Sequence, residues 1–273
     1  MARDLAGRRP SALARLRQRR QRRHQPMTVV EHLRELRYRL IVCLAAFGVV
    51  SVAAFAAFDP ITDVLLRPLC SLPPERLGPQ GCELTFIGAF EPFMVRLKIT
   101  AMTALVLASP VWLYQLWAFV VPAMTPKEKR YALPFVLTSI VLFAAGAVFA
   151  YSALPAGLDF LFSLGGDNLV PFLRAQEYLS FVGLMLLAFG ASFELPLLLF
   201  FLGLAEIVEA AQLRRLRRAA VVTIALIAAV VTPSQDPYTM LLMMAPLYGG
   251  YELCILALRV VERRRARARL ASG

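Results

Sequence analysis

Three glutamates stand where a carboxyl group is most able to do chemistry, and the first is Glu194. It is the one charged residue in the 28-residue stretch from Tyr178 to Ala205, with 16 uncharged residues before it and 11 after it. About 20 apolar residues cross a lipid bilayer, so this carboxyl group is predicted to lie well inside the hydrocarbon. An ionisable group at that depth is costly unless it is protonated, paired or wetted, and it typically marks a working site.

Two interpretations of Glu194 remain open from the sequence. Gly190 and Ser192 make the helix thin just before it, and Pro196 removes a backbone donor just after it, which favours a polar spot beside another backbone or water. Alternatively, a neutral Glu194 forms a structural hydrogen bond to a neighbouring helix.

The other two glutamates, Glu35 and Glu128, lie among bases in the segments HLRELR and PKEKR. Each has a purely local explanation, since Glu35 can pair with Arg39 four residues on and Glu128 can complete a capping box that begins at Thr125. The functional alternative is a pair of carboxylates that together bind two guanidinium groups, because arginine binds carboxylates through two parallel hydrogen bonds.

The elements that must position these residues are predicted to be membrane helices. The chain has 273 residues, of which 59% are hydrophobic, more than a soluble domain carries. We predict an all-α membrane protein with six spans: 40–58, about 93–121, 131 to about 154 with Pro155 closing the helix, 178–205, 219–231, and one that starts at Tyr238 and meets Glu252 after 14 residues.

The lysines and arginines give the orientation of these spans. The segment up to Arg39, the loops 122–130 and 206–218, and the tail from Arg259 carry 25 of the 30 basic residues, whereas the opposite loops carry three. Basic residues accumulate on the cytoplasmic side, so both termini are predicted to be cytoplasmic. The same distribution accounts for the net charge of +12 without nucleic acid as a partner. We expect residues 1–26 and 261–273 to be basic tails around one membrane domain, 27–260.

The sequence predicts two further features. Cys70 and Cys82 flank a proline-rich loop on the predicted outer side. The sequence leaves open whether these two thiols form a disulfide or stay reduced. The fifth apolar run, Ala219 to Val231, has only 13 residues, so the fifth and sixth helices are predicted to be short and the bilayer beside them thin.

Several segments together resemble one protein family. His32 to Arg37 (HLRELR) resembles the signature HLxELR, and Tyr114 to Ala123 (YQLWAFVVPA) resembles YQxWxFxxPA. Ser192 to Pro196 (SFELP) resembles SFExP, and Thr232-Pro233 with Asp236 resembles the family's last outer turn. The family is TatC, the polytopic subunit of the bacterial twin-arginine protein translocase, and the resemblance covers about residues 27–260.

The resemblance implies a glove-shaped bundle of six helices that receives the twin-arginine signal peptides of folded cargo. Glu35 and Glu128 would engage the two arginines, with Arg37 and Phe119 beside them. Glu194 and Gln115 would be polar groups within the membrane. Asp236 would be the acid of the last outer turn, unless it only caps the final helix, and Glu252 lies in the region of partner contact.

The resemblance also implies the setting. The partners would be the single-span TatA and TatB proteins, and the location would be the bacterial cytoplasmic membrane. We further expect self-association and contact with lipids. The sequence contains no pattern typical of an enzyme, a metal site or a cofactor site. The alternative function is a proton-coupled small-solute transporter that uses Glu194, although the internal repeats typical of such transporters are not evident.

Overall fold

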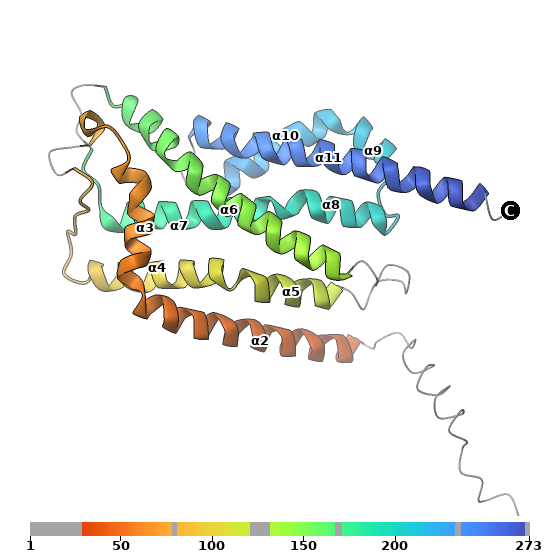
Figure 1. The fold of residues 1–273 in the computed structure, drawn as a ribbon, viewed down its shortest axis with the longest axis horizontal. Helices are drawn as coiled ribbons and strands as arrows, with labels where there is room; N and C mark the ends of the chain where they lie inside the picture. The colour runs from red at the N-terminus through yellow and green to blue at the C-terminus, as the bar shows by residue number, and fades with distance from the viewer. Residues whose placement is uncertain (1–28, 78–80, 121–131, 167–170, 233–235, 271–273) are drawn as a thin grey trace, which may run out of the picture. The chain divides into compact units, whose positions relative to one another are not determined.

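The computed structural model describes residues 29–77, 81–120, 132–166, 171–232 and 236–270. These residues form helices joined by turns and loops, with one isolated bridge between Thr85 and Arg174. Contacts divide the chain into two compact units, one ending at Ile41 and the other beginning at Val42. The helices, in chain order (Figure 1), are α2 (Val29–Ala56), α3 (Phe58–Cys70), η1 (Pro74–Arg76), α4 (Glu91–Leu107), α5 (Ser109–Val120), α6 (Ala132–Ser163), α7 (Ala175–Ser192), α8 (Glu194–Leu204), α9 (Ala210–Arg215), α10 (Arg217–Val231) and α11 (Pro237–Leu270).

The helices confirm an all-α membrane fold. In the described part of the chain, four segments are long and apolar enough to cross a bilayer, namely Val30–Ala56, Ala132–Ser163, Ala175–Leu204 and Pro237–Arg267. The helices α4 and α5 form a fifth candidate span that bends by 53°. The remaining predicted span is α10, which has 15 residues, about 22 Å of helix against a hydrocarbon core of ~30 Å.

Besides the break at Phe193, which separates α7 from α8 within the predicted fourth span, three helix boundaries differ from the sequence prediction. Pro155 does not close the third span, because α6 continues through it to Ser163, as prolines are tolerated within membrane helices. The second span is broken at Ala108, just before Ser109 and Pro110. The sixth helix is not short as a whole, since α11 has 34 residues and continues through the basic segment as far as Leu270.

Glycines let the central helices α6 and α7 approach closely. A Cβ atom on Gly146 of α6 would lie 2.6 Å from the carbonyl oxygen of Phe189 on α7. A Cβ atom on Gly190 of α7 would lie 2.8 Å from the ring of Phe143 on α6. Small residues of this kind are the usual means by which membrane helices pack tightly, so α6 and α7 form the centre of the second unit.

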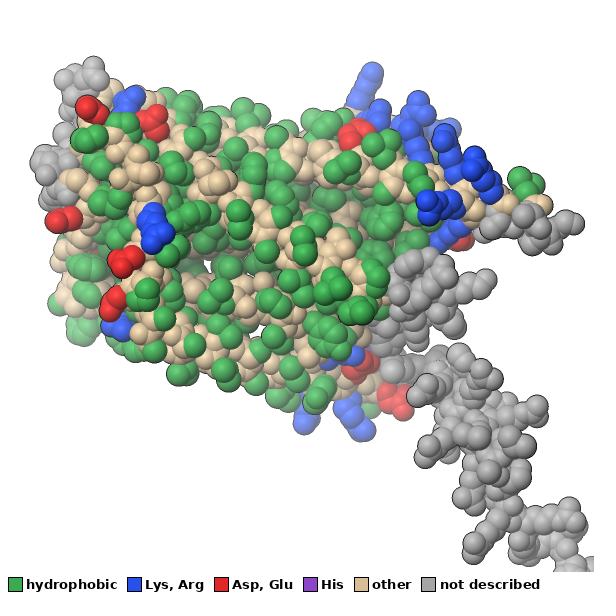
Figure 2. Space-filling model, in the orientation of Figure 1, with side chains coloured by type: hydrophobic (Ala, Val, Ile, Leu, Met, Phe, Trp, Pro, Cys, Tyr) green, Lys and Arg blue, Asp and Glu red, His purple; other side chains and the backbone are tan. Residues whose placement is uncertain are grey.

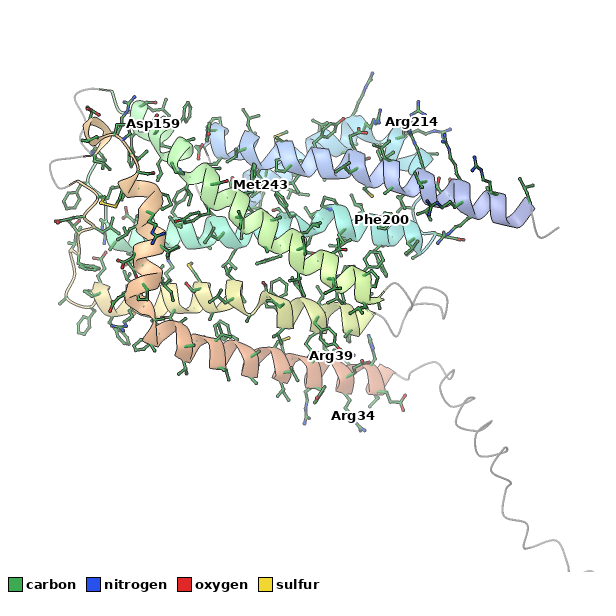
Figure 3. All side chains as sticks on the ribbon, in the orientation of Figure 1. Arg34, Arg39, Asp159, Phe200, Arg214 and Met243 are labelled. Atoms are coloured by element: carbon green, nitrogen blue, oxygen red, sulfur yellow. A yellow bond between two sulfur atoms is a disulfide. The ribbon has the colours of Figure 1, made fainter. Side chains whose placement is uncertain are left out.

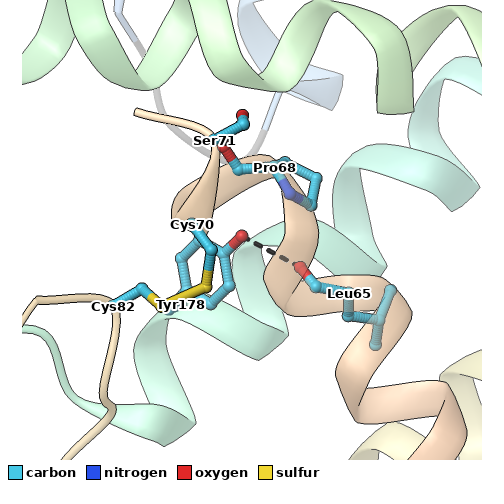
Figure 4. The surroundings of a disulfide bond; sticks show 6 residues. All are labelled: Leu65, Pro68, Cys70, Ser71, Cys82 and Tyr178. Atoms are coloured by element: carbon cyan, nitrogen blue, oxygen red, sulfur yellow. Dashed lines mark hydrogen bonds between the residues drawn. A yellow bond between two sulfur atoms is a disulfide. The ribbon is translucent and has the colours of Figure 1, made fainter. Parts of the chain in front are cut away.

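The segment between α2 and α4 forms a cap on the predicted outer side. Helix α3 runs across the neighbouring helices rather than along them (Figure 1). Cys70 at its end and Cys82 are joined by a disulfide, with Cα atoms 5.1 Å apart, and the Tyr178 hydroxyl of α7 donates to the Leu65 carbonyl at 2.9 Å (Figure 4). A further ion pair joins Arg76 to Asp159 of α6 at 3.1 Å. These contacts attach the predicted outer loop to the ends of α6 and α7.

Charged side chains gather toward the helix ends. Figure 2 shows hydrophobic side chains over the length of the helices, with Lys and Arg concentrated over α9 and the end of α11. The apolar surface between these ends is the one that lipid would cover.

Candidate functional site

Glu194 is the first residue of α8, directly after the break that separates α8 from α7. Its side chain is buried, at 9% exposure, and its Oε2 atom accepts a hydrogen bond of 2.6 Å from the hydroxyl of Ser139 on α6. The Ser139 side chain is fully buried. Among the described residues, the Glu194 Oε1 atom has no hydrogen-bond partner. The carboxyl group therefore has one fixed partner and one oxygen that can still form a hydrogen bond.

A groove of ≈ 570 Å³ is lined by residues that neighbour Glu194 in the sequence, although Glu194 itself does not line it. Residues of α6, α8 and α11 line it, including Phe193 and Pro196 on either side of Glu194 in sequence, and Phe200 (Figure 3). Gly250 lets α11 approach α8 closely, because a Cβ atom at this position would lie 2.5 Å from the Pro196 ring of α8. Gln115, the other predicted intramembrane polar residue, lies half-buried on α5. The groove is apolar, and Glu194 lies in the same stretch of chain without facing into it.

The residues predicted to bind a peptide are only partly described. Glu35 lies on α2 and pairs with Arg39 one turn later, with the Arg39 Nε atom 3.1 Å from the Glu35 Oε1 atom. Arg37 is exposed on the same helix, and Phe119 lies half-buried on α5. Glu128 lies outside the described residues. The local pairing considered for Glu35 is thus present in the structure.

Asp236 caps the last helix. Its Oδ1 atom accepts a 2.8 Å hydrogen bond from the backbone N–H of Thr239, and its Oδ2 atom accepts one of 2.5 Å from the Thr239 hydroxyl. The side chain is 8% exposed. This arrangement satisfies a free backbone donor at the helix N-terminus, which is the structural alternative that the sequence had left open.

Glu252 links the two last helices. It accepts a hydrogen bond of 2.5 Å from Arg217, the first residue of α10, and another of 3.1 Å from the hydroxyl of Tyr248. The sequence indicated that Glu252 lies on the last helix, but it did not indicate which residues of the chain contact it. The pair fixes the start of α10 against the middle of α11.

Glu91 is a buried acid that the sequence prediction missed. Its side chain accepts hydrogen bonds from the backbone N–H groups of Ile87 and Gly88, at 2.9 and 3.2 Å. Arg174, which precedes α7, lies 3.5 Å from it. The available signal was an acid followed by Pro92 at the start of an apolar run, a common pattern of a helix N-terminus. Glu91 holds together two loops of the predicted outer side.

Comparison with known proteins decides the family. The family model for "Sec-independent protein translocase protein (TatC)" matches residues 31–246. The chain belongs to the TatC family. Among curated TatC proteins, that of Frankia casuarinae is 47% identical over 88% of this chain and 68% of its own length. That of Aquifex aeolicus is 38% identical over 88% of this chain and 98% of its own length.

Solved TatC structures agree with this assignment. One described as the twin arginine translocase receptor TatC, in the detergent DDM, is 39% identical to this chain and has a TM-score of 0.71, covering 83% of this chain and 99% of that one. The Corynebacterium kroppenstedtii TatC is 36% identical, and the chain spans 63% of its length. The match to the TatC model ends at Pro246, so Glu252 and the basic end of α11 lie beyond it.

Proposed function

We propose that this chain is the receptor and assembly core of a twin-arginine translocase in the bacterial cytoplasmic membrane. The observation that carries the proposal is the likeness, at 39% identity and a TM-score of 0.71, to a protein described as the twin arginine translocase receptor. In this role the chain binds the signal peptides of folded proteins and supports their export with TatA and TatB partners, driven by the proton-motive force. The small-solute transporter alternative receives no support from the comparisons.

The proposed binding residues are Glu35, Arg37, Phe119 and Glu128, as the family resemblance implies. The Glu35–Arg39 ion pair suits this role, because an i,i+4 pair on a helix contributes only ~0.3–0.5 kcal/mol. An incoming peptide guanidinium that binds the carboxylate through two hydrogen bonds replaces that weak contact with a stronger one. Arg39 thus competes only weakly with an incoming peptide arginine for the Glu35 carboxylate.

The remaining assignments complete the proposal. Residues 27–260 form the membrane domain between two basic cytoplasmic tails, 1–26 and 261–273. TatA and TatB, and further copies of this chain, contact the domain within the bilayer, with Asp236 and Glu252 fixing α11 in the region of partner contact. Export is a transport step and involves no covalent chemistry by this chain.

Binding of a labelled twin-arginine peptide to the purified full chain tests the proposal. We expect Glu35→Ala or Glu128→Ala to weaken binding by ~1–3 kcal/mol, since charge-assisted hydrogen bonds are lost. Arg20→Ala and Arg22→Ala in the tail are the controls and should change little. Unchanged binding by the double variant Glu35→Ala, Glu128→Ala would remove these residues from the site.

A further inference from the structure

The packing of α8 against α11 marks the predicted cytoplasmic limit of the apolar surface. A Cβ atom on Gly203, one residue before the end of α8, would lie 2.3 Å from the Leu258 side chain of α11. The apolar part of α8 ends at Leu204, and the first arginine of α11 is Arg259. Both helices therefore change from apolar to polar at the same level, which is the level expected for the lipid headgroups.

The beginning of α10 lies deeper than this level. Arg217 pairs with Glu252, which comes six residues before Leu258, about 9 Å along a helix axis. Leu253 and Leu256, on α11 between these two levels, are 66% and 54% exposed, so the surface beside the pair is apolar. Arg217 is thus fixed at a depth where the neighbouring helix still faces lipid tails.

Three more arginines lie within one turn of Arg217 and face outward. Arg214, Arg215 and Arg218 are exposed, whereas Leu213, Ile224 and Ala228 of the same two helices are buried against their neighbours. Within the described part of the chain, none of the three takes part in an ion pair (Arg214 is marked in Figure 3). We call Arg214, Arg215 and Arg218 the arginine ledge.

The arginine ledge continues directly into an apolar stripe. Val222, Leu226 and Val230 of α10 recur every four residues after Arg218 and are 69%, 64% and 76% exposed. Residues at this spacing lie on one face of a helix. The exposed face of α9 and α10 therefore presents guanidinium groups at its cytoplasmic end and a strip of aliphatic side chains below them, which matches a phospholipid with its phosphate and its acyl chains.

We propose that the arginine ledge binds the phosphate headgroups of anionic phospholipids from the cytoplasmic leaflet. Arginine side chains on α9 and α10 tilt toward the cytoplasm, because helical side chains point toward the helix N-terminus. This tilt brings the guanidinium groups closer to the headgroup level, which lies about 9 Å away along the helix axis. Lipid phosphates that are drawn inward cover the remaining distance. Guanidinium groups bind phosphate oxygens through two parallel hydrogen bonds, and an anionic lipid adds a charge that offsets the three exposed arginines.

This site gives the thin bilayer predicted beside α10 a physical cause. The short helix alone allows the membrane to thin, whereas the arginine ledge draws the headgroups toward it. The inference does not depend on peptide binding by Glu35 and Glu128, which belong to other segments of the chain.

Native mass spectrometry of the full chain with titrated phosphatidylglycerol or phosphatidylcholine tests the site. We expect the wild-type protein to retain phosphatidylglycerol in preference to phosphatidylcholine. The double variant Arg214→Gln, Arg218→Gln should bind phosphatidylglycerol roughly 30-fold more weakly, equivalent to about 1 kcal/mol per lost arginine. The matched control is Arg263→Gln, Arg264→Gln, which removes the same charge from exposed positions of α11 beyond Leu258 and should retain the preference.

Three results would overturn the proposal: equal retention of both lipids by the wild type, equal loss of phosphatidylglycerol binding in the two double variants, or displacement of the lipid by inorganic phosphate alone. Equal loss would mean that only the overall charge attracts lipid. Circular dichroism establishes that each variant keeps its helices. If the double variant Arg214→Gln, Arg218→Gln does not fold, the single substitutions Arg215→Gln and Arg218→Gln replace it. Each should bind phosphatidylglycerol roughly fivefold more weakly than the wild type.

Discussion

Replacing Glu194 separates its possible roles, because the structure gives it one defined partner. Glu194→Gln keeps an acceptor for the Ser139 hydroxyl, whereas Glu194→Ala removes it. Hydrogen bonds between membrane helices contribute about 0.6 kcal/mol on average, and Ser139 can turn its hydroxyl to a carbonyl of its own helix. We therefore expect Glu194→Ala to lose only about 1 kcal/mol of stability, which leaves folded protein for a functional assay.

The assay is export of a folded cargo carrying a twin-arginine signal peptide, at matched membrane levels of each variant. We expect Glu194→Gln to keep substantial export and Glu194→Ala to lose it, because a polar contact within the membrane needs hydrogen bonding but not charge. The control Ser139→Ala breaks the same hydrogen bond while keeping the carboxyl group. It should export better than Glu194→Ala.

Each alternative has its own result. If Glu194 transfers protons, Glu194→Gln should fail as completely as Glu194→Ala. If the hydrogen bond to Ser139 is all that matters, Ser139→Ala should match Glu194→Ala. Full export by the alanine variant would show that Glu194 has neither role.

Three further predictions follow from the fold. Cys70 and Cys82 should both resist alkylation in protein handled without reductant, as mass spectrometry would record; two alkylated thiols would refute the bridge. Gly250→Ala should lower thermal stability by ~1–3 kcal/mol, because its Cβ atom would meet Pro196 at 2.5 Å, whereas the adjacent Gly249→Ala has nothing within 4 Å and should be nearly neutral; equal melting temperatures would contradict this packing. The bilayer beside α10 should be thinner than elsewhere when the protein is imaged in lipid nanodiscs, since α10 has 15 residues; a uniform hydrocarbon thickness of ~30 Å would be inconsistent with that expectation.

Much of the membrane fold could be predicted from the sequence, because a bilayer imposes length and polarity directly on each helix. The stretch around Glu194 was long and apolar enough to identify a span. The bend at Ala108 was not predicted, although Ser109 and Pro110 follow it, because apolarity alone does not indicate where a helix breaks. The continuation of α6 through Pro155 was not predicted either, because the prediction treated proline as a helix end. Proline is a weaker helix breaker in membranes than in water.

The partners of the polar residues were harder to predict. Glu35 and Arg39 are one helical turn apart, so their pairing follows from local spacing. Ser139 and Glu194 are 55 residues apart, and Arg217 and Glu252 are 35 apart, so these contacts depend on how the helices pack. Glu91 was passed over because its partners are backbone groups of a loop and an arginine from a distant segment. Local spacing gives capping and i,i+4 pairs, whereas long-range pairs require the three-dimensional structure.

The central claim, that this chain receives twin-arginine signal peptides, is tested most directly by cross-linking. A labelled peptide with a photoreactive group beside its two arginines would be added to the purified full chain in lipid, with a Lys-Lys peptide as control. Our account predicts cross-links to segments that include Glu35 and Glu128 for the twin-arginine peptide, and loss of most of them for the Lys-Lys peptide. Equal cross-linking by both peptides, or cross-links only at other segments, would contradict it.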